Sequence, residues 1–231
     1  MNKISIIIPI LNEAKTIEKL LFHLIDHAAL ENISEIIIVD GGSTDGALDL
    51  IKKTDLNIKT LTSPKGRAKQ MNIGVKAATG NIFYFLHADS FPPNRYDQLI
   101  INEVKKGNPA GCFRMQFDCN HWWLRLASWL TQFKWRACRG GDQSQFITRN
   151  VFNDIGGYDE NYTIYEDNIL INALYARNEF VVIQHKIKTS ARCYKRNGIW
   201  RLQYHFWTIY VKKWCGATAE ELHTYYKKHI C

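Results

Sequence analysis

The chain has 231 residues, a length that favours one domain with an extension over two complete domains. Hydrophobic residues make up 46% and charged residues 23%, the balance of a soluble globular protein with a substantial core. The formal charge of +8 favours anionic partners, and no apolar run approaches the roughly 20 residues that span a bilayer.

The compartment follows from the N-terminus and the cysteines. The apolar run 4–10 is too short for a signal peptide, and polar residues follow it at once. The six cysteines are scattered without a C-x-x-C pair, so neither a zinc site nor a redox motif is predicted. Idle thiols suit a reducing compartment, and the predicted localisation is the cytoplasm.

Strand and helix patterns alternate over the first ninety residues. Apolar, β-branched runs predict strands at 3–10, 35–40, 57–63 and 81–86. Apolar residues at helical spacing and good N-cap candidates predict helices between them, at 13–28, 43–53 and 65–80. Nearly continuous apolar strands separated by helices predict an α/β fold with a mostly parallel, Rossmann-like sheet flanked by helices on both faces.

The regular alternation of strand and helix patterns ends after residue 92. The sequence predicts a strand of alternating type, a tryptophan-rich helix, a second helix, a basic strand and an aromatic helix, at 110–118, 121–139, 166–178, 185–196 and 198–214. No repeats or flexible linkers interrupt the chain. We therefore expect one domain over 1–231, with a nucleotide-binding half (1–91), a mixed acceptor and catalytic half (92–197) and a helical extension (198–231).

Polar residues follow all four strands of the first half, where an open parallel sheet binds ligands. The segment "VDGGSTDG" lacks the G-x-G-x-x-G of a dinucleotide site. Its carboxylates, Asp40 and Asp45, would repel a diphosphate but accept hydrogen bonds from a base or ribose. A nucleoside loop and a plain Gly-Gly turn capped by Ser43 are both consistent with this pattern.

Two further strand ends carry candidate ligand groups. His87 and Asp89 alternate along an extended chain and therefore point the same way, toward a metal ion or a phosphate. Asp89 is equally interpretable as the cap of a following helix. Lys65, Arg67 and Lys69 at a helix start suit phosphate oxygens, or form a solvated basic face.

Taken in order, these motifs resemble those of the family 2 glycosyltransferases with the GT-A fold. The resemblance covers roughly residues 4 to 196 and rests on "IPILNEA", "VDGGSTDG", "RAKQMNIGVKAATG", "FLHADS", "GDQ" and "YEDNIL". It is greatest to a bacterial sub-branch that reads H-A-D where relatives read D-x-D.

The resemblance implies a donor site in the first half. Eight residues are expected at a uridine pocket, where they line or flank it, read the base or allow its close approach. They are Pro9, Leu11, Glu13, Asp40, Gly41, Gly42, Arg67 and Gln70. Asp89 matches the last Asp of D-x-D, the usual ligand of a divalent metal on the donor diphosphate. His87 replaces the first Asp, so it is expected at the nucleotide or the metal, and Mn²⁺ suits its imidazole better than Mg²⁺.

The resemblance implies the catalytic groups in the second half. Glu166 and Asp167 match the family's E-D motif, whose Asp acts as the base. Acidic residues in the first turn of a helix are the alternative interpretation. The family's G-D-Q, here Gly141, Asp142 and Gln143, is expected near acceptor and sugar. Arg192 is assigned to the same acceptor site. Together with Lys195 and Arg196 it could neutralise the departing diphosphate, and a surface basic strand is the equal alternative.

The aromatic helix 198–214 has two interpretations. Its apolar face either packs on the sheet or lies in a lipid headgroup layer, which gives a peripheral contact at the inner face of the membrane. We predict an inverting glycosyltransferase with a nucleotide-sugar donor, a UDP-sugar by preference, and an acceptor that is either a small molecule or lipid-linked. A nucleotidyltransferase and a non-catalytic membrane or nucleotide-binding adaptor are the alternatives. No nucleic-acid-binding module is recognisable.

Overall fold

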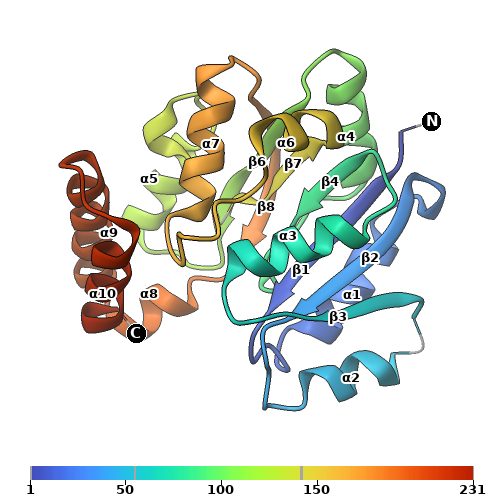
Figure 1. The fold of residues 1–231 in the computed structure, drawn as a ribbon, viewed down its shortest axis with the longest axis horizontal. Coiled ribbons are helices and arrows are strands. Elements are labelled where there is room, and N and C mark those ends of the chain that lie inside the picture. Colours follow the sequence, from blue (N-terminus) through green and yellow to red (C-terminus); the bar gives the residue numbers. More distant parts are fainter. Residues whose placement is uncertain (1, 55, 141–142, 231) are drawn as a thin grey trace.

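The computed structural model describes residues 2–54, 56–140 and 143–230. The described strands form one sheet in the order β3-β2-β1-β4-β7-β6-β8-β5, with helices on both faces (Figure 1). In the first half, β1 (Ile4–Ile10), β2 (Ile33–Asp40), β3 (Ile58–Thr62) and β4 (Ile82–Phe85) are all parallel. The predicted α/β class with a mostly parallel sheet is confirmed.

The second half extends this sheet with mixed pairing. Strand β7 (Gln145–Thr148) is antiparallel to both β4 and β6 (Ala110–Phe117). Strand β8 (Val181–Thr189) runs parallel to β6, and the short β5 (Ser90–Phe91) pairs antiparallel with β8. Two reversals restore the direction, so β6 and β8 end at the same edge of the sheet as β1, β2 and β4.

Two apolar layers hold the sheet between its helices. On one face, α1 (Ile17–Asp26), α2 (Ala47–Lys53) and α4 (Tyr96–Lys105) pack on the sheet around Tyr84. On the other face, the covering helices are α3 (Arg67–Ala77), α6 (Arg149–Ile155) and α7 (Glu166–Ala176). Because apolar side chains leave both faces of β1 and β2, these strands are continuous isoleucine and valine runs rather than alternating ones.

Helix α3 lies especially close to the sheet. A Cβ added at Gly74 would lie 2.5 Å from Cγ2 of Ile7, so only glycine allows this approach without a shift of the Ile7 side chain or of α3. The approach fixes the start of α3, which carries Arg67, near the ends of β1 and β2.

Several predicted boundaries were wrong. Helices α1 and α2 begin at Ile17 and Ala47, because the polar residues before them form loops that bind each other. The helix predicted over 121–139 is α5 (Trp122–Leu130), followed by a turn and a 3₁₀ helix (Arg136–Cys138). The basic strand predicted over 185–196 ends at Thr189, and its last residues form α8 (Arg192–Asn197). The sequence interpretation gave no separate bounds for α4 or for α10 (Ala219–His229), which lies within the predicted helical extension. It missed α6, β5, β7 and a 3₁₀ helix (Leu30–Asn32).

The predicted apolar face of the aromatic helix packs inside the protein. Leu202 and Ile209 of α9 (Ile199–Trp214) are buried against Leu222 and Ile230 at the α10 end and against the loop before α7. The two helices lie side by side at one end of the molecule (Figure 1). No helix in the described ranges has both the length and the apolar character needed to cross a bilayer.

A different face of α9 is exposed. Five large side chains repeat along it at alternating spacings of four and three residues, each at least 49% exposed: Trp200, Tyr204, Trp207, Val211 and Trp214. This set is called the α9 stripe below. It continues onto α5, where the ring of Trp122 lies 5.6 Å from that of Trp200.

Candidate active site

The loops after β1 and β2 are joined by hydrogen bonds between side chains and backbone. The amide of Asn12 donates to Oγ of Ser43 (2.9 Å), and the amide of Thr44 donates to Oδ1 of Asn12 (2.8 Å). The amide of Ala14 donates to a carboxylate oxygen of Asp45 (2.8 Å). Asn12 has a φ of 58°, which a side chain with local hydrogen bonds tolerates. The two loops therefore form one polar rim at the sheet edge.

Asp40 organises the second of these loops. It is 3% exposed, and its carboxylate accepts hydrogen bonds from the amides of Gly42 and Ser43 and from the Ser43 hydroxyl. Gly42 adopts a φ of 96°, which favours glycine. These contacts make Asp40 a loop-forming residue whether or not it also contacts a base.

Gln70 of α3 joins the ends of β1 and β2 through its side chain. It is 3% exposed, and its amide nitrogen donates to the carbonyls of Ile10 (2.8 Å) and Val39 (2.7 Å). A Cβ added at Gly41 would lie 3.2 Å from the Gln70 amide, so glycine gives room for this contact. Pro9 and Leu11, the other predicted pocket residues, are partly buried at the end of β1.

Arg192, at the start of α8, joins two strand ends that are distant in sequence. Its guanidinium forms a bidentate pair with Glu13, with Nη1 2.7 Å from Oε2. Its Nε lies 3.1 Å from Oδ2 of Asp89. The amide of Ser190 also donates to the Asp89 carbonyl, so β8 delivers Arg192 to the loop after β4.

His87 lies between two cations. Burial, followed by the positive charges of Arg67 and Arg192, lowers the pKa of its imidazole to about 3. The ring is therefore neutral near pH 7, the form that can ligate a metal. Arg67 in turn lies 3.7 Å from Glu166, measured from Nη1 to Oε1. The predicted donor and catalytic groups thus form a connected cluster.

The predicted base lies at the first turn of α7. Glu166 is 1% and Asp167 8% exposed, and the preceding Tyr165 has a φ of 72°, an uncommon value for a bulky residue. Burial and then the charges of Asp167 and Glu166 raise the pKa of the Tyr158 hydroxyl well above its usual range. Both carboxylates are therefore held in a mostly dry environment. Neither Tyr158 nor Tyr165 was assigned a role from the sequence, although Tyr165 is the first residue of the quoted "YEDNIL" motif.

The side chain of Gln143 is held by hydrogen bonds within the protein. It is buried, its amide nitrogen donates to the Cys138 carbonyl (2.6 Å), and its oxygen accepts from Arg139 (2.7 Å). Arg139 is itself buried and donates to the carbonyls of Thr131 and Phe133. Gly141 and Asp142, the other predicted acceptor residues, lie outside the described residues.

The family model "Glycosyl transferase family 2" matches residues 5–160. The chain belongs to glycosyl transferase family 2. Family membership confirms the resemblance that its motifs indicated, and it weighs against both the nucleotidyltransferase and the adaptor interpretations.

Curated family 2 relatives match part of the chain. A dolichyl N-acetyl-alpha-D-glucosaminyl phosphate 3-beta-D-2,3-diacetamido-2,3-dideoxy-beta-D-glucuronosyltransferase of Methanococcus voltae is 40% identical over 118 residues, 47% of this chain and 37% of that protein. A dolichol-phosphate mannosyltransferase of Pyrococcus furiosus is 33% identical over 110 residues, 46% of this chain and 31% of that protein. The matched region is thus about a third of each relative.

Solved structures establish the GT-A fold. S. aureus TarS 1–349 in complex with UDP superposes with a TM-score of 0.67 at 19% identity, over 82% of this chain and 60% of that one. The mannosyltransferase PcManGT from Pyrobaculum calidifontis, in complex with GDP-Man and Mn²⁺, superposes with a TM-score of 0.68 at 18% identity. That match covers 97% of this chain and 69% of PcManGT.

A divalent metal fits this family 2 site only together with a donor. Among the described residues, no three His, Cys, Asp or Glu side chains gather as a ready metal cage. Asp89 supplies one carboxylate and His87 one neutral imidazole. A hard cation that also takes oxygens from phosphates needs only one or two protein ligands. The donor set is therefore compatible with a metal held jointly by protein and diphosphate.

The structure gives Gln70 a role that can be separated from nucleotide binding. Gln70→Leu is expected to lower the free energy of unfolding by about 1–3 kcal/mol, because it removes two buried hydrogen bonds that contribute about 0.5–1.5 kcal/mol each. Urea denaturation measures the change. Lys76→Leu, an exposed change on the same helix, serves as the control and is expected to stay within about 0.5 kcal/mol of wild type. An unchanged unfolding free energy in Gln70→Leu would contradict the bracing role.

Proposed function

We propose that the protein is an inverting glycosyltransferase that moves a sugar from a UDP-sugar to an acceptor hydroxyl. The proposal is carried by one observation: the ion-pair cluster from Glu13 through Arg192 to Asp89 lies near His87, as does Arg67, which lies 3.7 Å from Glu166. The fold therefore gathers the residues of the family's donor and base motifs at one sheet edge. Residues 1–91 would hold the nucleotide and 92–197 the acceptor.

Asp167 is assigned the role of general base. As the acceptor oxygen attacks the anomeric carbon, its proton passes to the Asp167 carboxylate and the bond between that carbon and the diphosphate oxygen breaks. Attack from the face opposite the leaving nucleotide inverts the configuration. Arg67 and Arg192 are each half exposed, so their guanidinium groups can turn toward the negative charge of the departing diphosphate.

Asp167→Asn tests the base. The variant is expected to bind UDP nearly as wild type does and to lose on the order of a hundredfold or more in turnover, because the amide accepts no proton. Turnover with a UDP-sugar and calorimetric UDP affinity separate the two effects. Asp159→Asn, a carboxylate in the loop before α7, is the control. Equal turnover in Asp167→Asn and wild type would remove Asp167 as the base.

We propose that Asp89, with His87, holds Mn²⁺ or Mg²⁺ on the donor diphosphate. When bound, the cation would stabilise the negative charge that develops on the leaving group. The Mn²⁺ in the PcManGT complex and the fit of the donor set support this assignment. Arg192 now compensates the charge of Asp89, so it would have to move as the metal and diphosphate enter.

The metal is tested by calorimetry with UDP and, in parallel, GDP. UDP is expected to bind at least tenfold more tightly with Mn²⁺ than with EDTA, because the cation offsets repulsion between carboxylate and phosphates. Asp89→Ala should abolish that gain. Asp118→Ala, a carboxylate directly after β6, should keep it. An affinity for UDP that does not depend on the metal would defeat the metal assignment. Tighter binding of GDP than of UDP would identify GDP as the nucleotide of the donor.

We propose a peripheral contact of the α9 stripe with an anionic bilayer at the cytoplasmic face. Residues 192–219 carry six Lys or Arg and no Asp or Glu, so the exposed tryptophans lie among cations. Tryptophan beside lysine is the composition of helices that lie in a lipid interface, and the cytoplasmic leaflet is negatively charged. Cys112, Cys119, Cys138 and Cys215 are free thiols, which suits the same compartment.

The bilayer contact is measured by flotation with vesicles of phosphatidylcholine alone or mixed with phosphatidylglycerol. Binding to the anionic vesicles is expected, with at least a tenfold loss in Trp207→Gln/Trp214→Gln. Leu30→Gln, an equally exposed apolar residue on another surface, is the control. Equal flotation of the double variant and wild type would rule out the α9 stripe as the contact.

A further inference from the structure

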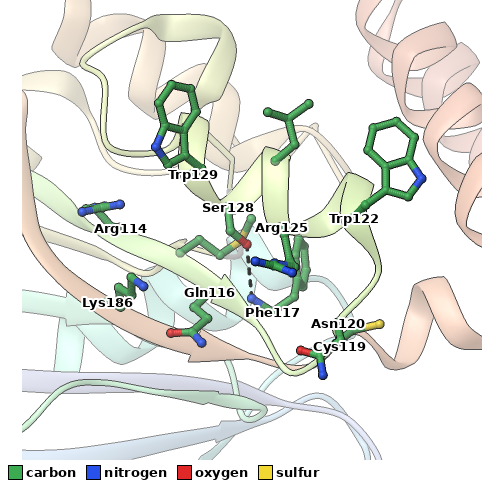
Figure 2. Close-up of a pocket in the computed structure, with 12 residues that line it drawn as sticks. Arg114, Gln116, Phe117, Cys119, Asn120, Trp122, Arg125, Ser128, Trp129 and Lys186 are labelled. Atoms are coloured by element: carbon green, nitrogen blue, oxygen red, sulfur yellow. Dashed lines mark hydrogen bonds between the residues drawn. The ribbon is translucent and has the colours of Figure 1, made fainter.

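A cavity of about 620 Å³ lies between α5 and the strands β6 and β8 (Figure 2). It exists because β7 pairs with β6 only at Ala110 and Gly111, which leaves the rest of that β6 edge open. Helix α5 and the turn after it cover the open edge with hydroxyl groups. The amide of Met115 donates to Oγ1 of Thr131 (2.9 Å), and that of Phe117 to Oγ of Ser128 (3.3 Å).

The wall of the cavity is cationic. Arg114 of β6 and Lys186 of β8 are register partners on adjacent strands, and Arg125 reaches in from α5 (Figure 2). Within the described part of the chain, no carboxylate lines the cavity and none of the three cations forms an ion pair. Like charges on neighbouring strands destabilise a sheet, so this pairing favours a bound anion.

Arg114 adds an unsatisfied donor. Its Nε is buried and has no hydrogen-bond partner among the described residues. A buried N–H that finds no acceptor costs about 1–3 kcal/mol, so native proteins rarely retain one without a use. An anion in the cavity would supply the acceptor that the protein does not.

The opposite wall is apolar. Trp122, Leu126 and Trp129 recur on α5 at helical spacing, with Arg125 on the same face. All three apolar side chains are at least 39% exposed. A ligand in this cavity would therefore meet cations on the strands and an apolar surface on the helix.

One end of the cavity lies at the carboxyl end of β6, on the sheet edge that carries the candidate active site. Phe117 and Cys119 line that end, and Asp118 between them accepts a hydrogen bond from the amide of Ala191 (2.7 Å). The next residue, Arg192, contacts Asp89. A molecule held in the cavity is therefore one short segment away from the proposed donor diphosphate.

We propose that this cavity binds the phosphate group of an amphiphilic acceptor, whose apolar part lies against α5. The inference rests on the proposed glycosyl transfer, because it names the class of acceptor. The phosphate would be held by Arg114, Arg125 and Lys186. Their guanidinium and ammonium groups form charge-assisted hydrogen bonds with phosphate oxygens.

Calorimetry with three small probes tests both halves of the ligand: octyl phosphate, octyl glucoside and inorganic phosphate. Octyl phosphate is expected to bind at least tenfold more tightly than either of the others. Arg114→Gln and the exposed Lys186→Gln should each weaken octyl phosphate binding at least tenfold, and Trp129→Gln should weaken octyl phosphate but not inorganic phosphate. Lys52→Gln on α2, a distant cation, is the control.

The outcomes separate this inference from the proposed function. UDP affinity should remain unchanged in Arg114→Gln and Lys186→Gln, so a failure of donor binding would not be mistaken for a failure of this cavity. Inorganic phosphate that binds as tightly as octyl phosphate would overturn the amphiphile. An equal loss of binding to phosphatidylglycerol vesicles in these variants would assign the cavity to bilayer headgroups and overturn the acceptor. Unchanged octyl phosphate affinity in both variants would overturn the site.

Discussion

The two hydrogen bonds from Gln70 to the ends of β1 and β2 are the contact on which the site's geometry depends. The carbonyls of Ile10 and Val39 lie at adjacent strand ends, and that of Ile10 also accepts a hydrogen bond from the amide of Gly41 (2.9 Å). Because a carbonyl has two lone pairs, the Gln70 amide can add a further hydrogen bond and join both strands to α3, which Gly74 allows to lie against β1. The loops that follow are therefore held at a fixed separation, and Asp40 and Asn12 close them into one rim.

Electrostatic balance explains how the site accommodates several carboxylates. Glu13 and Asp89 would repel one another without Arg192 beside both, and Arg67 compensates the charge of Glu166. Both arginines remain half exposed, so their charge is available to a ligand as well as to the protein. A site built in this way is neutralised at rest and would gain affinity for the proposed donor diphosphate when the cations change partners.

The first half was predictable because its signals are local. Strands buried on both faces are apolar throughout, and the polar residues that follow them are adjacent in sequence to the strand ends they mark. The boundaries near Glu13 and Ser43 were not predictable, because the loops there are stabilised by hydrogen bonds between segments about thirty residues apart. The contact of Arg192 with Asp89 and Glu13 spans far more of the chain. No spacing rule places these residues together.

The cationic cavity of the second half was not predictable from the sequence for a different reason. Arg114 and Arg125 appear in the sequence as ordinary members of an alternating strand and an aromatic helix. Only the shortness of β7 reveals that β6 has an open edge, and only the register of β6 with β8 sets Arg114 beside Lys186. A strand pattern reports which residues are buried but not which neighbour is missing. Where β6 lacks a neighbouring strand, α5 covers the open edge and a cavity lies between the helix and the sheet. That arrangement is visible only in three dimensions.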